Sequence, residues 1–421
     1  MRRQHCATNY CRLATMGLVL TARSLVPAPP QPNSPSGLPN VKIRNTVEIT
    51  SSKRYCWYPT VHRLSTGEIL VTVRMGPDER HPEGEFSAYC VSRDGGQTWS
   101  WRYTMGAGGN VDAAYSQVPP PDGTLLALGS GYDAVLPFPS DQTRRFQVAL
   151  TRFARGGMEI TQVRDALLRL REPARMVPAT LFDTGAKDTT RLESTPEVNP
   201  WGAIVEADNG DLLTTVYYLT EKDPRRRRLV LARSPDQGKT WDEYGVIAAL
   251  APDEAPWSWM GNEGPNEAAI VRLADRRLYC LFRTGGNAYM GHSWSSDDGK
   301  TWSPPASTGI QGVAPHLRRL SDGMLACSYG RPGPVSITFS TDGMGSAWSK
   351  AVEVFRGKST CYTDLIELES GRLLLVYDSV PYGWHQIPYS DKSARNIVYG
   401  TFVEVLNKFA ETRSSGGLDC G

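Results

Sequence analysis

Ser92-Arg-Asp94-Gly-Gly96-Gln-Thr98-Trp99 is the stretch that decides the fold, because its pattern returns along the chain. The pattern Ser-x-Asp-x-Gly-x-Thr-Trp occurs in full three times, at residues 92–99, 234–241 and 295–302. A degenerate fourth copy, with one residue inserted, occupies residues 340–348. Three full matches in a chain of 421 residues are too many for chance, so the chain is built from repeats.

Each copy has the residues of a tight hairpin turn. The Asp carboxylate can accept backbone N–H groups, the Gly supplies a positive φ, and the Trp offers a large apolar face. We expect each Trp to pack between neighbouring hairpins. The pattern therefore predicts a role in folding and not in catalysis.

A second repeat lies before these turns and predicts the remaining strands. Residues 61–71 show it, with one apolar stretch before and one after a polar turn at Gly67. Five more hairpins follow, with turns at Gly123, Gly210, Arg276, Gly323 and Gly371. Each hairpin is followed by a further β-rich stretch, which predicts six four-stranded units, the last completed by residues 396–405.

These units predict an all-β chain. Helices have almost no periodic support, and closing the units into a ring removes the exposed edges that so many strands would otherwise have. We therefore predict a six-bladed β-propeller over residues 41–407, with its core distributed between the blades. Residues 1–40 are expected to be a disordered N-terminal segment, and residues 408–421 a flexible C-terminal tail.

The repeated turn is the motif called the Asp box, and Asp boxes on a six-bladed propeller resemble the sialidase (neuraminidase) superfamily with its BNR repeats. The resemblance covers roughly residues 41–407. Asp boxes specify the fold far more strongly than the activity, because many binding propellers share them. The function therefore has to be argued from the central site.

Four residues resemble the sialidase active site in their order along the chain. Glu267 follows Gly-Pro-Asn at the start of the fourth hairpin, and Arg283 closes that hairpin between Phe and Thr. Arg331 follows Ser-Tyr-Gly at the end of the fifth hairpin, and Tyr362 follows Ser-Thr-Cys at the start of the last blade. The resemblance implies that Tyr362 is the nucleophile, that Glu267 is its partner base, and that Arg283 and Arg331 bind substrate.

The chemistry of sialic acid explains why the family uses these residue types. This sugar has a carboxylate on its anomeric carbon, which would repel an anionic nucleophile but not a neutral tyrosine hydroxyl. The hydroxyl then needs a base, and a glutamate can serve. Guanidinium groups suit the substrate carboxylate because their planar forks donate two parallel hydrogen bonds and stay charged.

The first arginine of the family pattern is absent. Sialidases typically place it two residues before a proline at the start of blade one, and in Cys56-Trp57-Tyr58-Pro59 that place belongs to Trp57. Arg54 lies three residues earlier and has no geometric reason to point the same way. Losing one charged partner of a carboxylate costs on the order of 1.5 to 3 kcal/mol, which weakens binding or signals a different sugar. Trp57 is expected either to pack in the core or to stack on a sugar.

The acid/base aspartate of the family lies in the loop after the first hairpin. This loop contains Asp78, Glu79, Glu83 and Glu85, and any of the four could protonate a leaving oxygen if burial raised its pKa. Asp78 is preferred on residue type. His81 in the same loop could bind sugar, although a single loop histidine is more often plain surface.

Each candidate also has a structural interpretation. Glu267 and Arg283 could form a structural ion pair, Tyr362 could be an ordinary strand aromatic, and Arg331 before Pro332 could shape a turn. Three classes of function stay open: a sialidase-like retaining exo-glycosidase, a glycosidase or lyase for another sugar, and a non-catalytic carbohydrate- or protein-binding propeller. A pure binding module needs no nucleophile with a base, which favours an enzyme. The missing arginine favours the second class.

Composition excludes several other functions. The net charge of +2 and the pI near 8.1 give no case for nucleic acid as a partner, and the run of arginines at 225–228 is expected to be a solvated loop before a strand. No apolar stretch approaches the roughly 18 residues of a membrane span. No metal or phosphate-binding motif is present, so we predict no metal and no cofactor. A glycan or glycoconjugate substrate is expected, and nothing in the sequence predicts an oligomeric state.

The N-terminal region and the cysteines leave the compartment open. Two arginines precede a weakly apolar segment at residues 13–22, and a Pro-rich linker follows it. If this segment is a signal peptide, the protein is secreted or periplasmic; otherwise it is cytoplasmic. The eight cysteines form no C-x-x-C pair, and several lie in apolar strand-like runs, so we expect buried free thiols.

Overall fold

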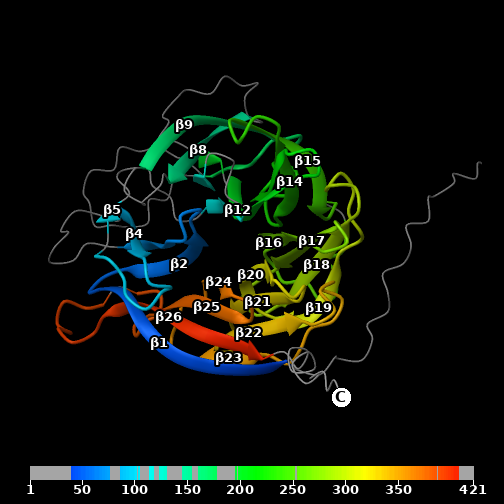
Figure 1. Cartoon of the computed structure of the whole chain (residues 1–421). Coiled ribbons are helices and arrows are strands. Elements are labelled where there is room, and N and C mark those ends of the chain that lie inside the picture. Colours follow the sequence, from blue (N-terminus) through cyan, green and yellow to red (C-terminus); the bar gives the residue numbers. More distant parts are fainter. Residues whose placement is uncertain are drawn as a thin grey trace, which may run out of the picture. The chain divides into compact units, whose positions relative to one another are not determined.

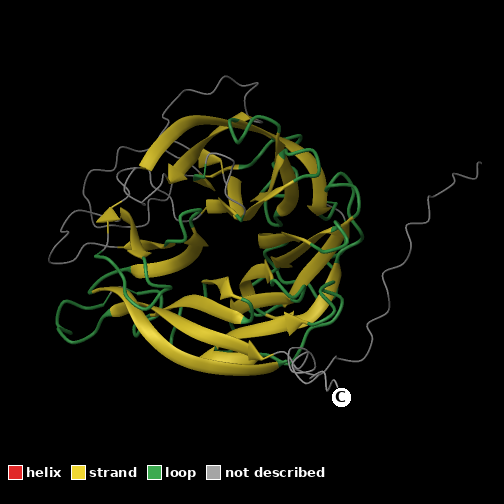
Figure 2. Ribbon diagram, in the orientation of Figure 1, coloured by secondary structure: helices red, strands yellow, loops and turns green. Residues whose placement is uncertain are grey.

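The structure is a computed structural model that describes residues 39–75, 86–101, 103–104, 113–117, 123–129, 145–153, 160–177, 195–196, 198–251, 254–385 and 387–406. Its contacts divide the chain into Met1–Gln31 and Pro32–Gly421, and all described residues belong to the second unit. Every regular element in these ranges is a strand, and none is a helix (Figure 2). The prediction of an all-β chain is confirmed.

Three of the sheets are antiparallel, four-stranded and continuous in sequence. The first contains β2 (Cys56–Arg63), β3 (Ile69–Met75), β4 (Phe86–Ser92) and β5 (Tyr103–Thr104). The second contains β16 (Asn266–Arg272), β17 (Leu278–Arg283), β18 (Tyr289–Ser295) and β19 (Ala306–Gln311). The third contains β20 (Val313–Arg319), β21 (Leu325–Gly330), β22 (Val335–Ser340) and β23 (Val352–Phe355).

Eight further strands form one closed sheet. It contains β6 (Ala113–Ser116), β7 (Leu125–Gly129), β8 (Arg145–Phe153), β9 (Ile160–Arg169), β12 (Val198–Glu206), β13 (Leu212–Tyr218), β14 (Arg228–Ser234) and β15 (Thr240–Ala248). Two antiparallel runs, β6 to β9 and β12 to β15, are joined by parallel pairing of β6 with β12 and of β9 with β15. A small sheet of β10 (Met176–Val177) and β11 (Thr195–Pro196) lies between the two runs in sequence.

The last sheet combines both ends of the described chain. β24 (Thr363–Glu369), β25 (Arg372–Ser379) and β26 (Asn396–Leu406) form an antiparallel run, as the sequence predicted for residues 396–405. Its fourth strand is β1 (Asn40–Ser52), which pairs with β26 from Asn40 opposite Leu406 to Ser52 opposite Asn396. No sequence pattern predicts this role of β1.

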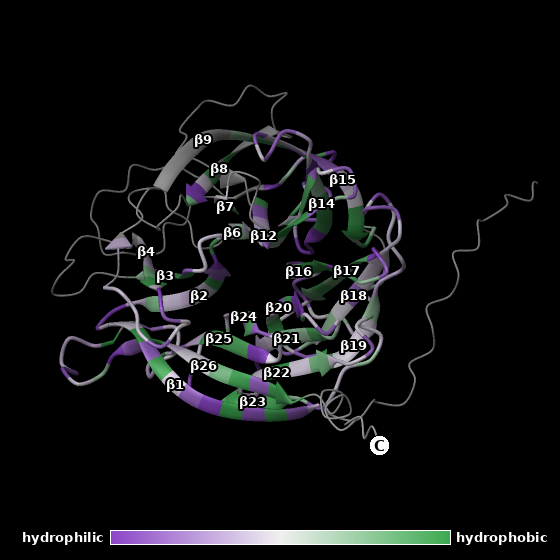
Figure 3. Ribbon diagram, viewed as in Figure 1, coloured by the Kyte–Doolittle hydropathy of each residue, from purple (hydrophilic) through white to green (hydrophobic). Residues whose placement is uncertain are grey.

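Buried apolar clusters join each strand run to the next. One residue pair from each cluster illustrates this: Tyr89 with Tyr115, Leu126 with Val216, Leu213 with Phe282, Tyr279 with Cys327, Phe339 with Leu375, and Val73 with Phe402. The last pair joins β25–β26 to β2–β3, so the runs follow one another around a closed ring (Figure 1). Hydrophobic residues accordingly lie along the strands (Figure 3).

The Asp boxes have the geometry that their residues predict. Asp236 Oδ1 accepts hydrogen bonds from Thr240 N at 2.8 Å and from Ser234 Oγ at 2.9 Å, and Gly238 has a φ of +89°. Trp241 has no exposed surface and packs in the cluster shared with β7, while the three other box tryptophans pack partly buried against equivalent clusters. The predicted folding role of the boxes is confirmed.

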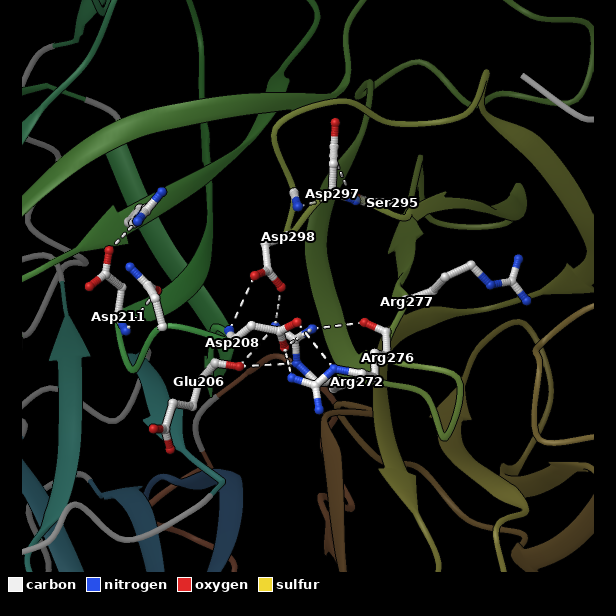
Figure 4. A network of polar contacts seen from close by, with 12 residues as sticks. Glu206, Asp208, Asp211, Arg272, Arg276, Arg277, Ser295, Asp297 and Asp298 are labelled. Carbon is white, nitrogen blue, oxygen red and sulfur yellow. Dashed lines mark hydrogen bonds and ion pairs between the residues drawn. The ribbon is translucent and has the colours of Figure 1, made fainter. Parts of the chain in front are cut away.

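Ion pairs connect neighbouring runs at the hairpin turns. Arg272, at the end of β16, lies 2.7 Å from Asp298 of the third Asp box and 3.4 Å from Asp208 in the β12–β13 turn (Figure 4). The arginine run at 225–228 forms ion pairs within its own strand run: Arg226 pairs with Asp223 of the same loop at 2.6 Å and Arg228 with Glu243 of the adjacent strand β15 at 3.2 Å. The predicted loop before a strand is confirmed and Arg225 is exposed, but Arg226 and Arg228 are half-buried in ion pairs and not solvated as expected.

The described cysteines are buried thiols outside any disulfide, as predicted for several of them; they are Cys56, Cys90, Cys280, Cys327 and Cys361. Within the described ranges no helix is long and apolar enough to cross a membrane.

A backbone irregularity recurs at the start of four first strands. The register of β2, β12, β16 and β20 shifts there, between Trp57 and Thr60, Trp201 and Ile204, Asn266 and Ala269, and Val313 and His316. A residue with positive φ lies in each shift: Tyr58 at 55°, Gly202 at 84°, Glu267 at 42° and Ala314 at 45°. Such bulges turn side chains away from the regular strand directions.

Candidate active site

Tyr362 and Glu267 meet although they belong to different sheets. Glu267 lies in the bulge of β16, and Tyr362 immediately precedes β24. The Tyr362 hydroxyl donates a hydrogen bond to Glu267 Oε1 at 2.5 Å. Glu267 is 7% exposed and Tyr362 is half-buried, so the pair is largely shielded from solvent.

Arg283, at the end of β17, completes this group. Its Nη1 donates to both carboxylate oxygens of Glu267 at 2.8 Å and lies 3.4 Å from the Tyr362 hydroxyl. Its Nη2 donates to Glu263 Oε1 at 2.8 Å. Arg283 is therefore already held between two carboxylates, of which the sequence analysis had singled out only one.

The protonation state of the pair follows from its surroundings. Burial, and next the Glu267 carboxylate, raise the pKa of Tyr362 well above its ordinary value. Burial alone would lower the pKa of Arg283, but the Glu267 carboxylate beside it raises it. At neutral pH the tyrosine is thus protonated and the arginine charged, so Glu267 Oε1 is positioned to receive the tyrosine proton.

Arg331 follows β21 and lies against aromatic rings. Its guanidinium is 5.8 Å from the ring centre of Tyr362 and 5.2 Å from that of Trp384, within cation–π range. Its Nη2 donates to Thr360 O at 2.9 Å, and its buried Nε has no hydrogen-bond partner in the described part of the chain. Among the described residues no carboxylate pairs with Arg331, so its charge is open to an anion.

An aromatic wall surrounds the tyrosine. The rings of Tyr58, Trp201 and Trp384 lie 4.6, 5.9 and 6.3 Å from that of Tyr362, all edge to face. Trp384 comes from the long β25–β26 connection and is 45% exposed. An exposed indole beside a candidate nucleophile can stack on the apolar face of a sugar ring.

Trp57, which stands where the family has its first arginine, is 8% exposed. Its ring lies edge to face against Tyr58 at 6.1 Å and Trp384 at 5.6 Å, so it packs against two rings of the aromatic wall. Arg54 contacts a different segment, donating to Ile387 O at 2.8 Å with its guanidinium over the Tyr389 ring. A substrate contact by Trp57 stays a prediction.

The acid/base candidates lie outside the described residues. These are Asp78, Glu79, Glu83 and Glu85, with His81 in the same segment at 76–85. The structure therefore neither brings Asp78 to Tyr362 nor separates the two.

A small polar cavity lies among the first strands of the runs. Its lining includes His62, Gln117, His316, Arg318 and Asp364. Asp364 accepts from Val61 N at 3.0 Å and lies 3.1 Å from His316 Nδ1. Burial would raise its pKa, but His316 and then Arg318 lower it. Burial lowers the pKa of His62 to about 3, so its ring is neutral. In the described part of the chain no cluster of three or more His, Cys, Asp or Glu residues could hold a metal ion.

Sequence reasoning missed Glu263, Tyr58 and Trp384. Glu263 lies four residues before Glu267, a spacing that could have drawn attention to it. Tyr58 occupies the same bulge position in β2 as Glu267 does in β16, a correspondence visible only once the two strands are aligned by their register shifts. No local sequence pattern marks Trp384 as a site residue.

Comparison with known proteins supports the fold. Residues 175–378 match the family of the BNR repeat-like domain. No curated protein sequence matches the chain. A protein of unknown function from Dyadobacter fermentans has a TM-score of 0.62 at 22% identity, over 88% of this chain and 100% of that one.

Two similar structures are glycosidases. The α-L-arabinofuranosidase Arb93A of Fusarium graminearum has a TM-score of 0.57 at 16% identity, over 86% of this chain and 98% of the enzyme. The Hadza microbial sialidase Hz136 has a TM-score of 0.56 at 15% identity, over 82% of this chain and 65% of the enzyme. These likenesses concern the fold. The match of residues 175–378 to the BNR repeat-like domain and the three complete Asp boxes agree with the resemblance to the sialidase superfamily.

Proposed function

We propose that the chain is a retaining exo-glycosidase of the sialidase type, which removes a terminal sialic acid or a related acidic sugar from a glycan or glycoconjugate. The observation that carries this proposal is the 2.5 Å hydrogen bond from the Tyr362 hydroxyl to Glu267, with Arg283 bound to the same carboxylate. A nucleophile within hydrogen-bond reach of a base that is itself oriented by a third group is typical of covalent catalysis.

The reaction has two steps. In the first, Tyr362 Oη attacks the anomeric carbon while its proton passes to Glu267, and Asp78 donates a proton to the leaving oxygen. In the second, Asp78 accepts a proton from a water molecule, whose oxygen attacks the anomeric carbon. The bond to Tyr362 breaks as the bond to water forms, and the tyrosine recovers its proton from Glu267. Two displacements retain the anomeric configuration.

Substrate binding is assigned to the arginines. Arg331, which has no carboxylate partner among the described residues, is the main candidate to bind the substrate carboxylate. Arg283 lies close enough to the Tyr362 hydroxyl to assist in binding the substrate. Trp384 and Tyr58 offer aromatic surface to the sugar.

The propeller is proposed to have six blades over residues 41–407. The eight-stranded sheet consists of two antiparallel four-stranded runs joined by parallel edge contacts. Counted as two blades, these runs and the four four-stranded sheets give six, in agreement with the six predicted hairpins.

A specific observation favours a different sugar as the second candidate. Arg283 is already paired with Glu263 and Glu267, and Trp57 replaces an arginine, so of the two candidate arginines only Arg331 has no carboxylate partner among the described residues. A glycosidase for a sugar without a carboxylate needs no further arginine. The arabinofuranosidase with a similar fold makes α-L-arabinofuranosides the first such substrates to try.

The test is turnover of a fluorogenic α-sialoside and a fluorogenic α-L-arabinofuranoside by the full chain, compared with Tyr362→Phe and Glu267→Gln. Sialoside turnover that both variants lose supports the proposal. Turnover of the arabinoside alone would replace it with the second candidate. Binding on a glycan array without any turnover would make the chain a non-catalytic binding propeller.

A further inference from the structure

Asp378, at the end of β25, lies behind the candidate site with no exposed surface. Its Oδ1 accepts hydrogen bonds from Ser359 Oγ at 2.9 Å and from Thr360 N at 2.7 Å. Its Oδ2 accepts from the Thr360 hydroxyl and, at 3.3 Å, from Tyr58 N. One carboxylate thus gathers donors from two separate segments of the chain.

Both segments carry parts of the site. Thr360 precedes Tyr362 by two residues, and Tyr58 packs its ring against Tyr362 at 4.6 Å. The backbone is unusual at both places, since Tyr58 has a φ of 55° and Cys361 a φ of 65°. Residues in this sparsely populated region persist only where surrounding bonds hold them. Asp378 supplies such bonds to both segments.

We propose that Asp378 is a positioning residue, whose ionised carboxylate fixes Tyr58 and the Tyr362 segment so that the Tyr362 hydroxyl meets Glu267. The proposal rests on the proposed function of this site. It differs from a purely structural role because all four bonds need acceptor lone pairs, which a protonated carboxyl offers in smaller number.

The ionisation of Asp378 falls in a range that experiments can reach. Burial raises its pKa from 3.8 to about 6, against the opposing effect of the hydroxyl and backbone donors. The titratable or charged groups in the surrounding elements are Cys361 and Tyr362 beside Thr360, Tyr58 on β2, and Arg331, which donates to Thr360 O. None of these accounts for the shift, which burial causes.

The sign of this shift separates positioning from stabilisation. Because the native pKa is raised, the contribution of Asp378 to stability is fully present below about pH 3.8 and is lost as the pH rises through about 6. At pH 7.5 the ionised carboxylate therefore weakens the fold while it holds the site. A carboxylate whose only role was to stabilise the fold would instead strengthen the fold when it is ionised.

The test compares the full chain with Asp378→Asn, with Asp242→Asn on the outer strand β15 as the matched control. The near-ultraviolet circular dichroism of the aromatic wall reports the arrangement without requiring activity. We expect a transition near pH 6 in the wild type and the control, and its absence in Asp378→Asn. The wild-type kcat should exceed that of Asp378→Asn at least tenfold at pH 7.5, with the ratio approaching one below pH 5. Asp378→Asn should be no less stable at pH 7.5.

The outcomes are distinguishable. A spectral transition that persists in Asp378→Asn, or an activity ratio independent of pH, would overturn the proposal. Thr360→Val removes one donor to the carboxylate and should move the wild-type transition to higher pH, which keeps the proposal testable if Asp378→Asn does not fold. A transition that stays in place in this variant also contradicts it. If the wild type turns over no glycoside, the proposed function fails, and the spectral test still decides the role of Asp378.

Discussion

The hydroxyl of Tyr362 lies 2.5 Å from Oε1 of Glu267, although 95 residues separate the two in sequence. Arg283 approaches the same carboxylate from β17, so the three side chains form one hydrogen-bonded group. Each comes from the end of a strand where the chain leaves or enters a sheet. The arrangement supplies a protonated nucleophile and a base that are already in contact.

Replacing Tyr362 by Phe, or Glu267 by Gln, should lower kcat at least about a hundredfold, because a positioned general base contributes about 10² to 10⁴ in rate and the phenol is the nucleophile itself. The measurement is steady-state hydrolysis of the best fluorogenic glycoside. Tyr103→Phe, on the outer strand β5, is the control and should leave kcat unchanged. Turnover retained by Tyr362→Phe would show that the chain uses another nucleophile.

Replacing Arg331 by Ala should raise KM for a substrate with a carboxylate by about 10- to 100-fold, because a hydrogen bond to a charged group contributes about 1.5 to 3 kcal/mol. KM for a neutral glycoside should change little. Measuring both substrates with the same variant separates the loss of charge recognition from general damage to the site. An equal rise in KM for both would contradict the assignment of Arg331 to the carboxylate.

Replacing Trp384 by Ala should raise KM several-fold with a smaller effect on kcat, since the indole is exposed beside Tyr362 and is not bonded to Glu267. Trp384→Phe should restore much of the binding because it keeps an aromatic face. A kcat that falls while KM stays constant would instead indicate that Trp384 orients Tyr362.

Much of this architecture could be predicted from local patterns. The boxes and the hairpins are short, and their turns are set by residues close in sequence, such as Asp236 with Thr240. Glu267, Arg283, Arg331 and Tyr362 could be named because the residues around them resemble the sialidase motifs in order and spacing. Their mutual contacts agree with that resemblance.

The parts that could not be predicted depend on distant partners or on backbone conformation. β1 pairs with β26, and no local pattern indicates a partner 344 to 366 residues away. Tyr58 and Glu267 adopt positive φ although neither is glycine, so composition gives no sign of their bulges. The role of Trp384 comes from how the β25–β26 connection lies against β2, and the buried position of Asp378 has a similar tertiary origin.

Replacing Trp241 by Ala should lower the free energy of unfolding by about 3 to 5 kcal/mol, as expected for a large aromatic side chain lost from a core. Trp241 has no exposed surface, and its Nε1 donates to Gly238 O at 2.9 Å within the Asp box. Trp101→Ala is the matched control, because this indole is 55% exposed. Urea unfolding followed by fluorescence measures both. Similar losses for the two variants would mean that the box tryptophan does not carry the packing assigned to it.

The stability of the fold toward acid should depend on His62, which burial keeps neutral by lowering its pKa from 6.5 to about 3. A lowered native pKa means that the unfolded chain binds the proton first, so this contribution to stability is present above pH 6.5 and is lost as the pH falls toward 3. The loss for one such group is about 1.4 kcal/mol per pH unit within that window. His62→Gln should therefore gain stability relative to the wild type as the pH is lowered from 7 to 4.5, measured by urea unfolding at each pH. The pKa of Asp378 is raised, so its protonation stabilises the fold as the pH falls from about 6 to 3.8. Asp378→Asn cannot gain this stability and should become less stable relative to the wild type as the pH is lowered over that interval. Curves for the two variants that diverge in these opposite directions would reveal compensating ionisations in the wild type, whereas parallel curves would show that neither buried group titrates as its surroundings imply.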